Sequence, residues 1–195
     1  MSATPTTALQ ELAFEDAGAW AAWLEREHAS SPGIWLRIAK STAGVASVQY
    51  QGALDVALCY GWIDGVKRRI DDDYWVQRFT PRTARSLWSK VNRTKVQALI
   101  DDGRMRPAGL REIERARADG RWDAAYDPAS KATVPDDLQA ALDASPAALA
   151  FFLSLNSQNR YAILHRTQTA KKPETRARRI ARFVAMLERG EKIHP

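Results

Sequence analysis

Two runs of alternating residues, 62–70 and 74–80, are separated only by three consecutive aspartates at 71–73. Aspartate tolerates turn conformations and hydrogen-bonds to its own backbone, so this spacing predicts a β-hairpin. A third alternating run, 34–39, follows a Ser-Ser-Pro-Gly break and predicts another strand. Because helical patterns surround these strands, we expect an α+β fold in which a small antiparallel sheet is packed by helices.

Helix start and stop signals flank the strands. Asp16 can cap a helix that runs to about His28, and Gly61 is suited to end a helix within 47–60. Residues 1–11 are small and polar and are predicted to form an ill-ordered tail.

Further helices are predicted after the hairpin. Ser89 is an N-cap candidate with Asn92 three residues later, and Gly103 follows the predicted end of that helix. Pro107 is well placed to open another helix, which ends near Ala118.

The stretch 127–135 contains two prolines among small residues and predicts a boundary. We therefore expect an α+β core at 1–126, a linker at 127–135 and an all-helical C-terminal region at 136–195. Four helices are expected in that region, with start signals at Pro135-Asp136-Asp137, Ser145-Pro146, Ser157 and Lys172-Pro173.

Positive charge is concentrated near the C-terminus. The formal net charge is +6, and residues 160–195 contain ten Lys/Arg but only three Glu. Such a region can bind a polyanion or simply be solvated. The candidate polyanion-binding residues are Lys171, Lys172, Arg176 and Arg179.

Several classes of protein are disfavoured by missing motifs. The three histidines are isolated and Cys59 is the single cysteine, so no zinc-site spacing is present. Phosphate-binding glycine loops and nucleophile elbows are also absent. We expect no metal and no cofactor, and we interpret Cys59 as a small buried hydrophobic residue. No apolar run approaches the roughly 20 residues that cross a bilayer, and no secretory pattern is present, so we expect a cytoplasmic protein.

Residues typical of binding sites are densest between 62 and 92. Tryptophan supplies stacking surface, arginine supplies charge, and a helix N-terminus favours an anion. The candidate ligand-binding residues are Trp62, Asp64, Arg78, Thr80, Arg82, Ser86, Trp88, Ser89 and Asn92. They predict a cleft for a small anionic or aromatic ligand, although capping by Ser89 and aromatic core packing also explain part of the pattern.

Asp64 is the best candidate for a functional carboxylate. Strict alternation places it on the strand face of Trp62, whose indole would shield it, and of Arg68, which like Arg78 is a candidate to pair with it. Two interpretations follow: Asp64 is the acid or base of an enzyme of unknown reaction, or it forms a structural bridge to an arginine.

Several segments together resemble the YdeI/OmpD-associated family of bacterial proteins. They are Gly61-Trp62-Ile63-Asp64-Gly65 with the preceding Ala53–Cys59, Phe79-Thr80-Pro81-Arg82, Ser86–Asn92, Gly103–Gly109 and Ala170–Ile180, within a resemblance that covers about residues 12–190. The resemblance implies bacteriocin protection or association with a porin, and it supplies no catalytic residues.

We therefore expect a bacterial stress or antimicrobial-resistance protein that is non-catalytic and binds a small anionic or aromatic ligand. The alternatives are an enzyme that uses Asp64 and a nucleic-acid binder that uses the basic C-terminal helices.

Overall fold

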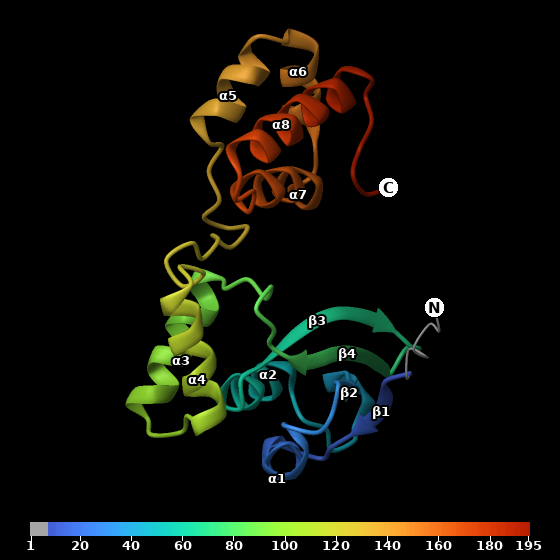
Figure 1. Cartoon of the computed structure of the whole chain (residues 1–195). Coiled ribbons are helices and arrows are strands. Elements are labelled where there is room, and N and C mark those ends of the chain that lie inside the picture. The colour runs from blue at the N-terminus through green and yellow to red at the C-terminus, as the bar shows by residue number, and fades with distance from the viewer. Residues whose placement is uncertain (1–7) are drawn as a thin grey trace, which may run out of the picture. The chain divides into compact units, whose positions relative to one another are not determined.

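The computed structural model describes residues 8–195, which form two compact units (Figure 1). The sheet unit comprises the chain up to Ser86 together with Asn92–Asp123. The helical unit comprises Leu87–Val91 together with Ala124–Pro195. Each unit is described separately below.

The sheet unit contains a four-stranded sheet in the order β1-β2-β4-β3. β2 (Ile34–Ala39) pairs antiparallel with β4 (Tyr74–Pro81), and β4 pairs antiparallel with β3 (Trp62–Arg69). The predicted hairpin and the predicted strand at 34–39 are therefore confirmed, as is the α+β fold class. β1 (Gln10–Ala13) adds a parallel strand at the edge, beside β2.

β1 corrects the prediction of an ill-ordered tail at 1–11. Gln10 and Glu11 are paired in register with Ile34 and Trp35, whereas residues 1–7 lie outside the described residues. None of the four β1 residues is buried, so the strand lacks the alternation of apolar and polar residues by which a strand is predicted from sequence. Its conformation comes from pairing with a distant strand, which local patterns do not encode.

The helices that flank the sheet begin and end near the predicted signals. α1 spans Ala17–Glu27, and Asp16 caps it by accepting from the Ala19 N–H at 2.8 Å. α2 spans Tyr50–Cys59 and is followed by Gly61 at φ 75°, a conformation that favours glycine. A short 3-10 helix, η1 (Ser41–Ala43), precedes α2.

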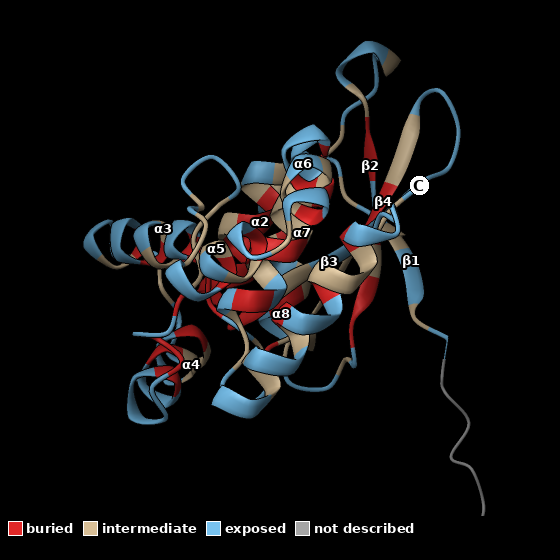
Figure 2. Ribbon diagram, turned by 90° about the horizontal axis from the view of Figure 1, so that it is seen from above, coloured by how far each residue is buried: buried red, intermediate tan, exposed pale blue. Residues whose placement is uncertain are grey.

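α1 and α2 cover one side of the sheet, which we call the helix-covered face. Trp20 of α1 is fully buried, contacts the rings of Trp62 and Phe79, and donates its indole N–H to the Ala53 carbonyl of α2. Buried residues accordingly lie along β2, β4 and α2 (Figure 2). Within the described part of the sheet unit no helix packs on the opposite side, which we call the open face (Figure 1).

Two more helices belong to the sheet unit, apart from the first two residues of the earlier helix. α3 (Lys90–Asp101) begins directly after Ser89, and α4 (Pro107–Ala118) matches the predicted helix. α4 approaches α2 closely at Gly109, where a Cβ atom would lie 2.3 Å from the carbonyl oxygen of Cys59.

The helical unit contains the four helices that the start signals predict. These are α5 (Asp136–Asp143), α6 (Pro146–Ser154), α7 (Ser157–Gln168) and α8 (Pro173–Glu188). They enclose their own core, whose largest fully buried side chains are Leu138, Leu142 and Ile163. A unit with its own apolar core can be stable by itself.

Candidate functional site

A β-bulge in β3 reverses the side-chain alternation that the sequence predicts. Asp64 is opposite Phe79, but Lys67 is opposite Gln77, so residues 65 and 66 together face one residue of β4. One added residue moves all later side chains to the other face. Arg68 therefore lies on the open face, and the prediction that it shares a face with Trp62 and Asp64 is wrong.

The bulge brings Gly65 against Arg78, which lies on the open face. A Cβ atom on Gly65 would lie 2.9 Å from Nε and 3.1 Å from Nη2 of Arg78. Gln77 holds the bulge from the helix-covered face, because its side-chain amide donates to the Gly65 carbonyl at 2.8 Å. The Nε atom of Arg78 is buried and has no hydrogen-bond partner among the described residues.

An indole lies on the same face, on the neighbouring strand β2. Trp35 of β2 is directly opposite Arg78, and the Cζ atom of Arg68 lies 4.2 Å from the centroid of the Trp35 ring. This distance is short enough for a cation–π interaction. Trp35 thus shares this face with two arginines, one of which contacts its ring, and we call Trp35, Arg68 and Arg78 the open-face site.

The two arginines of the open-face site keep their charge available. In the part of the chain that the structure describes, neither Arg68 nor Arg78 forms an ion pair with a carboxylate. Arg37 lies on the same face but is paired with Glu11, with a distance of 2.6 Å between Nη2 and Oε1. The open face therefore presents two uncompensated positive charges next to an indole, an arrangement suited to an anion with an aromatic ring.

Trp62 and Asp64, both predicted to bind ligand, lie on the helix-covered face. Trp62 is 1% exposed, donates its indole N–H to the His28 carbonyl at 3.1 Å and packs edge-on against Trp20. Asp64 accepts a hydrogen bond from the Tyr50 hydroxyl at 2.8 Å. Trp62 is thus a core residue in this structure, and Asp64 is bonded to a helix rather than to either of the arginines considered above.

Thr80, Arg82 and Ser86 lie at and beyond the end of β4. Thr80 is half-buried on the open face, two residues after Arg78. The Arg82 side chain is buried, and its backbone N–H donates to the Gly61 carbonyl at 2.9 Å. The Ser86 hydroxyl accepts from the Thr83 N–H at 2.9 Å, which stabilises the turn there.

Arg121 is a buried charged residue that the sequence analysis did not single out. It is 3% exposed, its Nε contacts both Asp119 carboxylate oxygens at 2.8 and 2.7 Å, and its Nη1 donates to the Ser86 carbonyl at 3.0 Å. A buried charge is tolerated when it is paired in this way. The signal in the sequence is Asp119-Gly120-Arg121, because Gly120 at φ 75° turns the arginine back onto the aspartate.

Trp88 and Ser89 belong to the helical unit, whereas Asn92 belongs to the sheet unit. The Trp88 carbonyl accepts from the Tyr126 N–H at 3.0 Å, and Ser89 forms a β-bridge with Tyr126. All three predicted residues are largely buried, with exposed fractions of 2%, 8% and 8%. Of the predicted ligand-binding set, Arg78 and Thr80 are the two that share the open face.

The predicted polyanion-binding residues have different surroundings. Arg176 makes a two-point ion pair with Asp137, with distances of 2.6 and 2.8 Å, and this pairing lowers the pKa of Asp137. Lys171 and Lys172 are exposed. Arg179 is half-buried and donates to the Arg166 carbonyl. Arg176 is therefore engaged within the unit.

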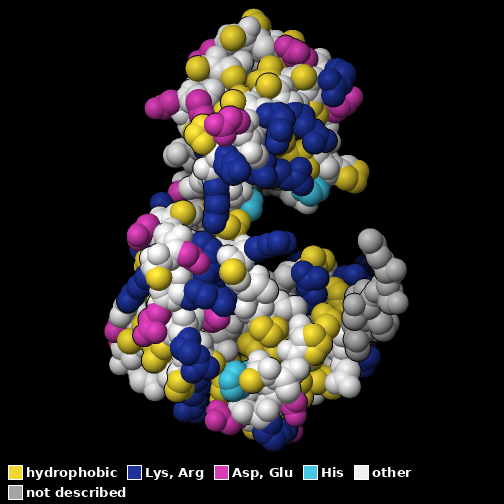
Figure 3. Space-filling model, viewed as in Figure 1, with side chains coloured by type: hydrophobic (Ala, Val, Ile, Leu, Met, Phe, Trp, Pro, Cys, Tyr) yellow, Lys and Arg dark blue, Asp and Glu magenta, His cyan; other side chains and the backbone are white. Residues whose placement is uncertain are grey.

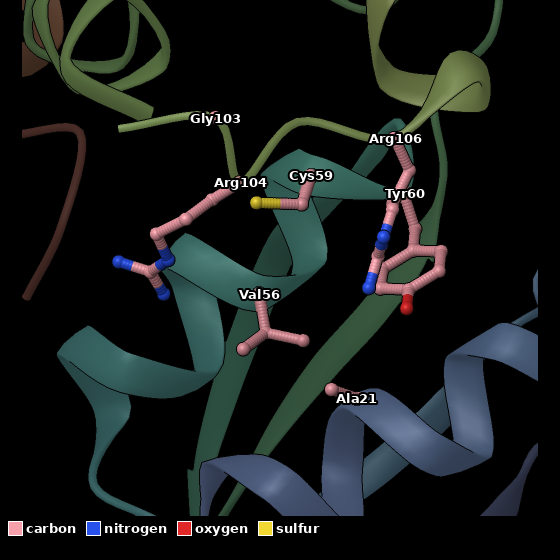
Figure 4. A pocket seen from close by; sticks show the side chains of 7 residues that line it. All are labelled: Ala21, Val56, Cys59, Tyr60, Gly103, Arg104 and Arg106. Atoms are coloured by element: carbon pink, nitrogen blue, oxygen red, sulfur yellow. The ribbon is translucent and has the colours of Figure 1, made fainter. Parts of the chain in front are cut away.

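A separate pocket of about 280 Å³ lies between α1, α2 and the loop before α4 (Figure 4). Burial raises the pKa of Cys59, which lines it, so the thiol stays protonated at neutral pH. Tyr60 donates its hydroxyl to Glu25 at 2.7 Å, and Arg106 lies 3.9 Å from the same carboxylate. Glu25 offsets the charge of Arg106, whereas Arg104, which also lines the pocket, forms no ion pair with the described residues.

Two other features bear on function. Over residues 8–195 no three His, Cys, Asp or Glu side chains come close enough to hold a metal ion. Among the same residues, none of the helices is both long and apolar enough to cross a membrane.

The fold and the open-face site define an α+β protein with a basic, aromatic sheet surface and a separate helical unit. Residues 12–112 match the family described as a domain of unknown function (DUF8412), and because this match spans half of the chain, the protein belongs to that family. Residues 131–190 match a second family model, described as Bacteriocin-protection, YdeI or OmpD-Associated. No curated protein and no solved structure matches the chain.

The second match confirms the resemblance to the YdeI/OmpD-associated family, over residues 131–190. Of the five segments on which that resemblance rests, Ala170–Ile180 lies within the second match, and the other four lie within the first. The helical region is thus similar to that family.

Proposed function

We propose that the protein is a non-catalytic binding protein of the bacteriocin-protection type, which takes a small anionic ligand with an aromatic ring at the open-face site. The observation that supports this most is the buried Nε of Arg78, which has no partner among the described residues. A buried donor without a partner costs about 1–3 kcal/mol, and an anionic oxygen would remove that cost.

The chemistry of the site suits such a ligand. A guanidinium group binds a carboxylate or phosphate through two parallel hydrogen bonds, so Arg78 would orient the anion. Arg68 stacks on Trp35 and offers a flat cationic surface on which an aromatic ring packs. Thr80, on the same face, supplies a hydroxyl. This arrangement supports binding and uses no acid, base or nucleophile.

The protective role is supported by the family match at residues 131–190. A protein that captures an anionic aromatic molecule can protect a cell by lowering its free concentration. The capture takes place in the sheet unit, at the open-face site.

Calorimetric titration with phenyl phosphate, salicylate and 4-hydroxybenzoate tests the proposal. We expect at least one of them to bind, and Arg78→Gln or Arg68→Gln to weaken it about tenfold or more, as loss of a charged hydrogen bond does. Arg37→Gln is the matched control, because it removes a guanidinium from the same face that is already paired with Glu11. It should change the affinity less than about threefold.

Two results would contradict the proposal. One is no binding of any of the three compounds at about 1 mM. The other is an equal loss of affinity in the Arg37 and Arg78 variants, which would indicate attraction by overall charge alone.

A further inference from the structure

The helical unit contains a basic pocket that the open-face site does not involve. It has a volume of about 550 Å³, within the range of small-molecule sites. α7, α8 and the C-terminal segment line it with Arg166, Arg179, Arg182, Phe183, Met186, Arg189, Glu191, Lys192 and Ile193. In Figure 3, Lys and Arg side chains gather around hydrophobic ones on this unit.

The C-terminal segment forms one wall because buried hydrogen bonds hold it against α7. Asn159 of α7 is 1% exposed; its Oδ1 accepts from the His194 N–H at 2.8 Å and its Nδ2 donates to the His194 carbonyl at 3.2 Å. Gly190, at φ 68°, turns the chain back after α8. Lys192 and Ile193 are thereby fixed at the pocket.

Most of the positive charge in the pocket is uncompensated. Glu191 is its single carboxylate, and Arg189 occupies it with two hydrogen bonds at 2.9 and 2.8 Å. Arg166, Arg179, Arg182 and Lys192 form no ion pair within residues 8–195. Like charges held this close repel one another, and a bound anion would relieve that repulsion.

We infer that this pocket binds a small molecule with several phosphate groups, of the nucleoside di- or triphosphate class. Guanidinium groups bind phosphate oxygens through paired hydrogen bonds, and four unpaired cations match a ligand of several negative charges. Met186 and Ile193 are half-buried and provide apolar surface for a base or a sugar.

The grouping of the cations around a single pocket distinguishes this ligand from nucleic acid. Single-stranded nucleic acid follows an extended basic groove, with a site of roughly 4–16 nucleotides per binding domain. Here the cations surround one pocket, while Arg176 of the same helix is paired with Asp137. A compact phosphate compound fits these observations better.

Calorimetry of the full chain with ATP, inorganic tripolyphosphate and a single-stranded oligonucleotide tests the inference. We expect ATP and tripolyphosphate to bind at the same single site per chain. Arg182→Gln or Arg166→Gln should weaken the affinity for both compounds about tenfold. Arg178→Gln is the matched control. Because Arg178 is exposed on α8 but does not line the pocket, its loss should change the affinity less than about twofold. If ATP binds more tightly than tripolyphosphate, the ligand is a nucleotide. If the two bind equally, the ligand is an inorganic polyphosphate. Both results support a phosphate site.

Three outcomes would overturn the inference. The first is that neither phosphate compound binds at about 1 mM. The second is that Arg178→Gln weakens binding as much as Arg182→Gln. The third is that the oligonucleotide binds more tightly than ATP, with a steep dependence on salt.

Discussion

Gly65 and Arg78 lie so close across the β3–β4 pair that a Cβ atom on Gly65 would be 2.9 Å from the Nε of Arg78. Because Gly65 is not at positive φ, alanine is compatible with its backbone, and the flexible arginine would move instead. We expect Gly65→Ala to cost less than about 1 kcal/mol of unfolding free energy. The same change should weaken binding at the open-face site about tenfold, because Arg78 is displaced.

Urea unfolding and titration with the compound that binds in calorimetry measure the two effects in the same variant. A loss of stability above about 3 kcal/mol would show that Gly65 serves the fold, and unchanged binding would show that the position of Arg78 does not matter.

Gly109 and Gly52 provide a comparison of the same substitution in two helices. A Cβ atom on Gly109 would lie 2.3 Å from the Cys59 carbonyl oxygen, so Gly109→Ala must force α2 and α4 apart. We expect a loss of about 1–3 kcal/mol, as for other overpacked cores. Gly52→Ala meets only Ala17 at 3.7 Å and should stabilise α2 by up to about 1 kcal/mol. Urea unfolding that ranks the two variants in the opposite order would contradict the packing of α4 on α2.

Local signals were sufficient for most of the fold. Asp16, Gly61 and Pro107 mark helix boundaries that the structure confirms, because caps and chain reversals depend on residues near in sequence. The edge strand β1 and the bulge at Gly65 were missed because both depend on pairing with another strand.

The candidate site was harder to predict than the fold. One residue added at the bulge exchanges the faces of β3, so the sequence grouped Arg68 with Trp62 when the structure groups it with Trp35. Trp35 itself was assigned only to a strand, since no local pattern shows which arginine will stack on it. Patterns of period two cannot report a bulge that a glycine accommodates.

The ion pair between Asp137 and Arg176 should give the helical unit a measurable pH dependence. The hydrogen bond from Arg176 lowers the pKa of Asp137 below its ordinary value of 3.8. The stabilisation of the folded state by this ion pair is therefore complete above pH 3.8 and is lost as the pH falls through the lower folded-state pKa. We expect Asp137→Asn to cost about 0.5–1 kcal/mol at neutral pH, since both groups are partly exposed. Urea unfolding should show this difference shrinking in acid; a constant difference would argue against the pair.

His165 should affect the stability of the folded protein at a higher pH than Asp137 does. Burial lowers its pKa from 6.5, and Arg166 and Arg179 lower it further, so the folded protein takes up the proton less readily than the unfolded chain. Stability is unaffected above pH 6.5 and decreases as the pH falls from there towards the folded-state pKa. We expect His165→Phe, which keeps a ring beside Tyr126 and Tyr161, to reduce this acid loss. Hydrogen exchange of α7 below pH 6.5 measures this loss of stability in the natural protein and in the His165→Phe variant. An identical loss in the two proteins would exclude His165 as the cause.

The indole N–H signal of Trp35 in a nitrogen–proton correlation spectrum tests the central claim most directly. Seven tryptophans give seven such signals, and Trp35→Phe identifies the one required. Titration with whichever of phenyl phosphate, salicylate and 4-hydroxybenzoate binds in calorimetry should shift the Trp35 signal to saturation in the natural protein, and Arg78→Gln should abolish the shift. An unmoved Trp35 signal, or an equal shift in the Arg78 variant, would contradict binding at the open-face site.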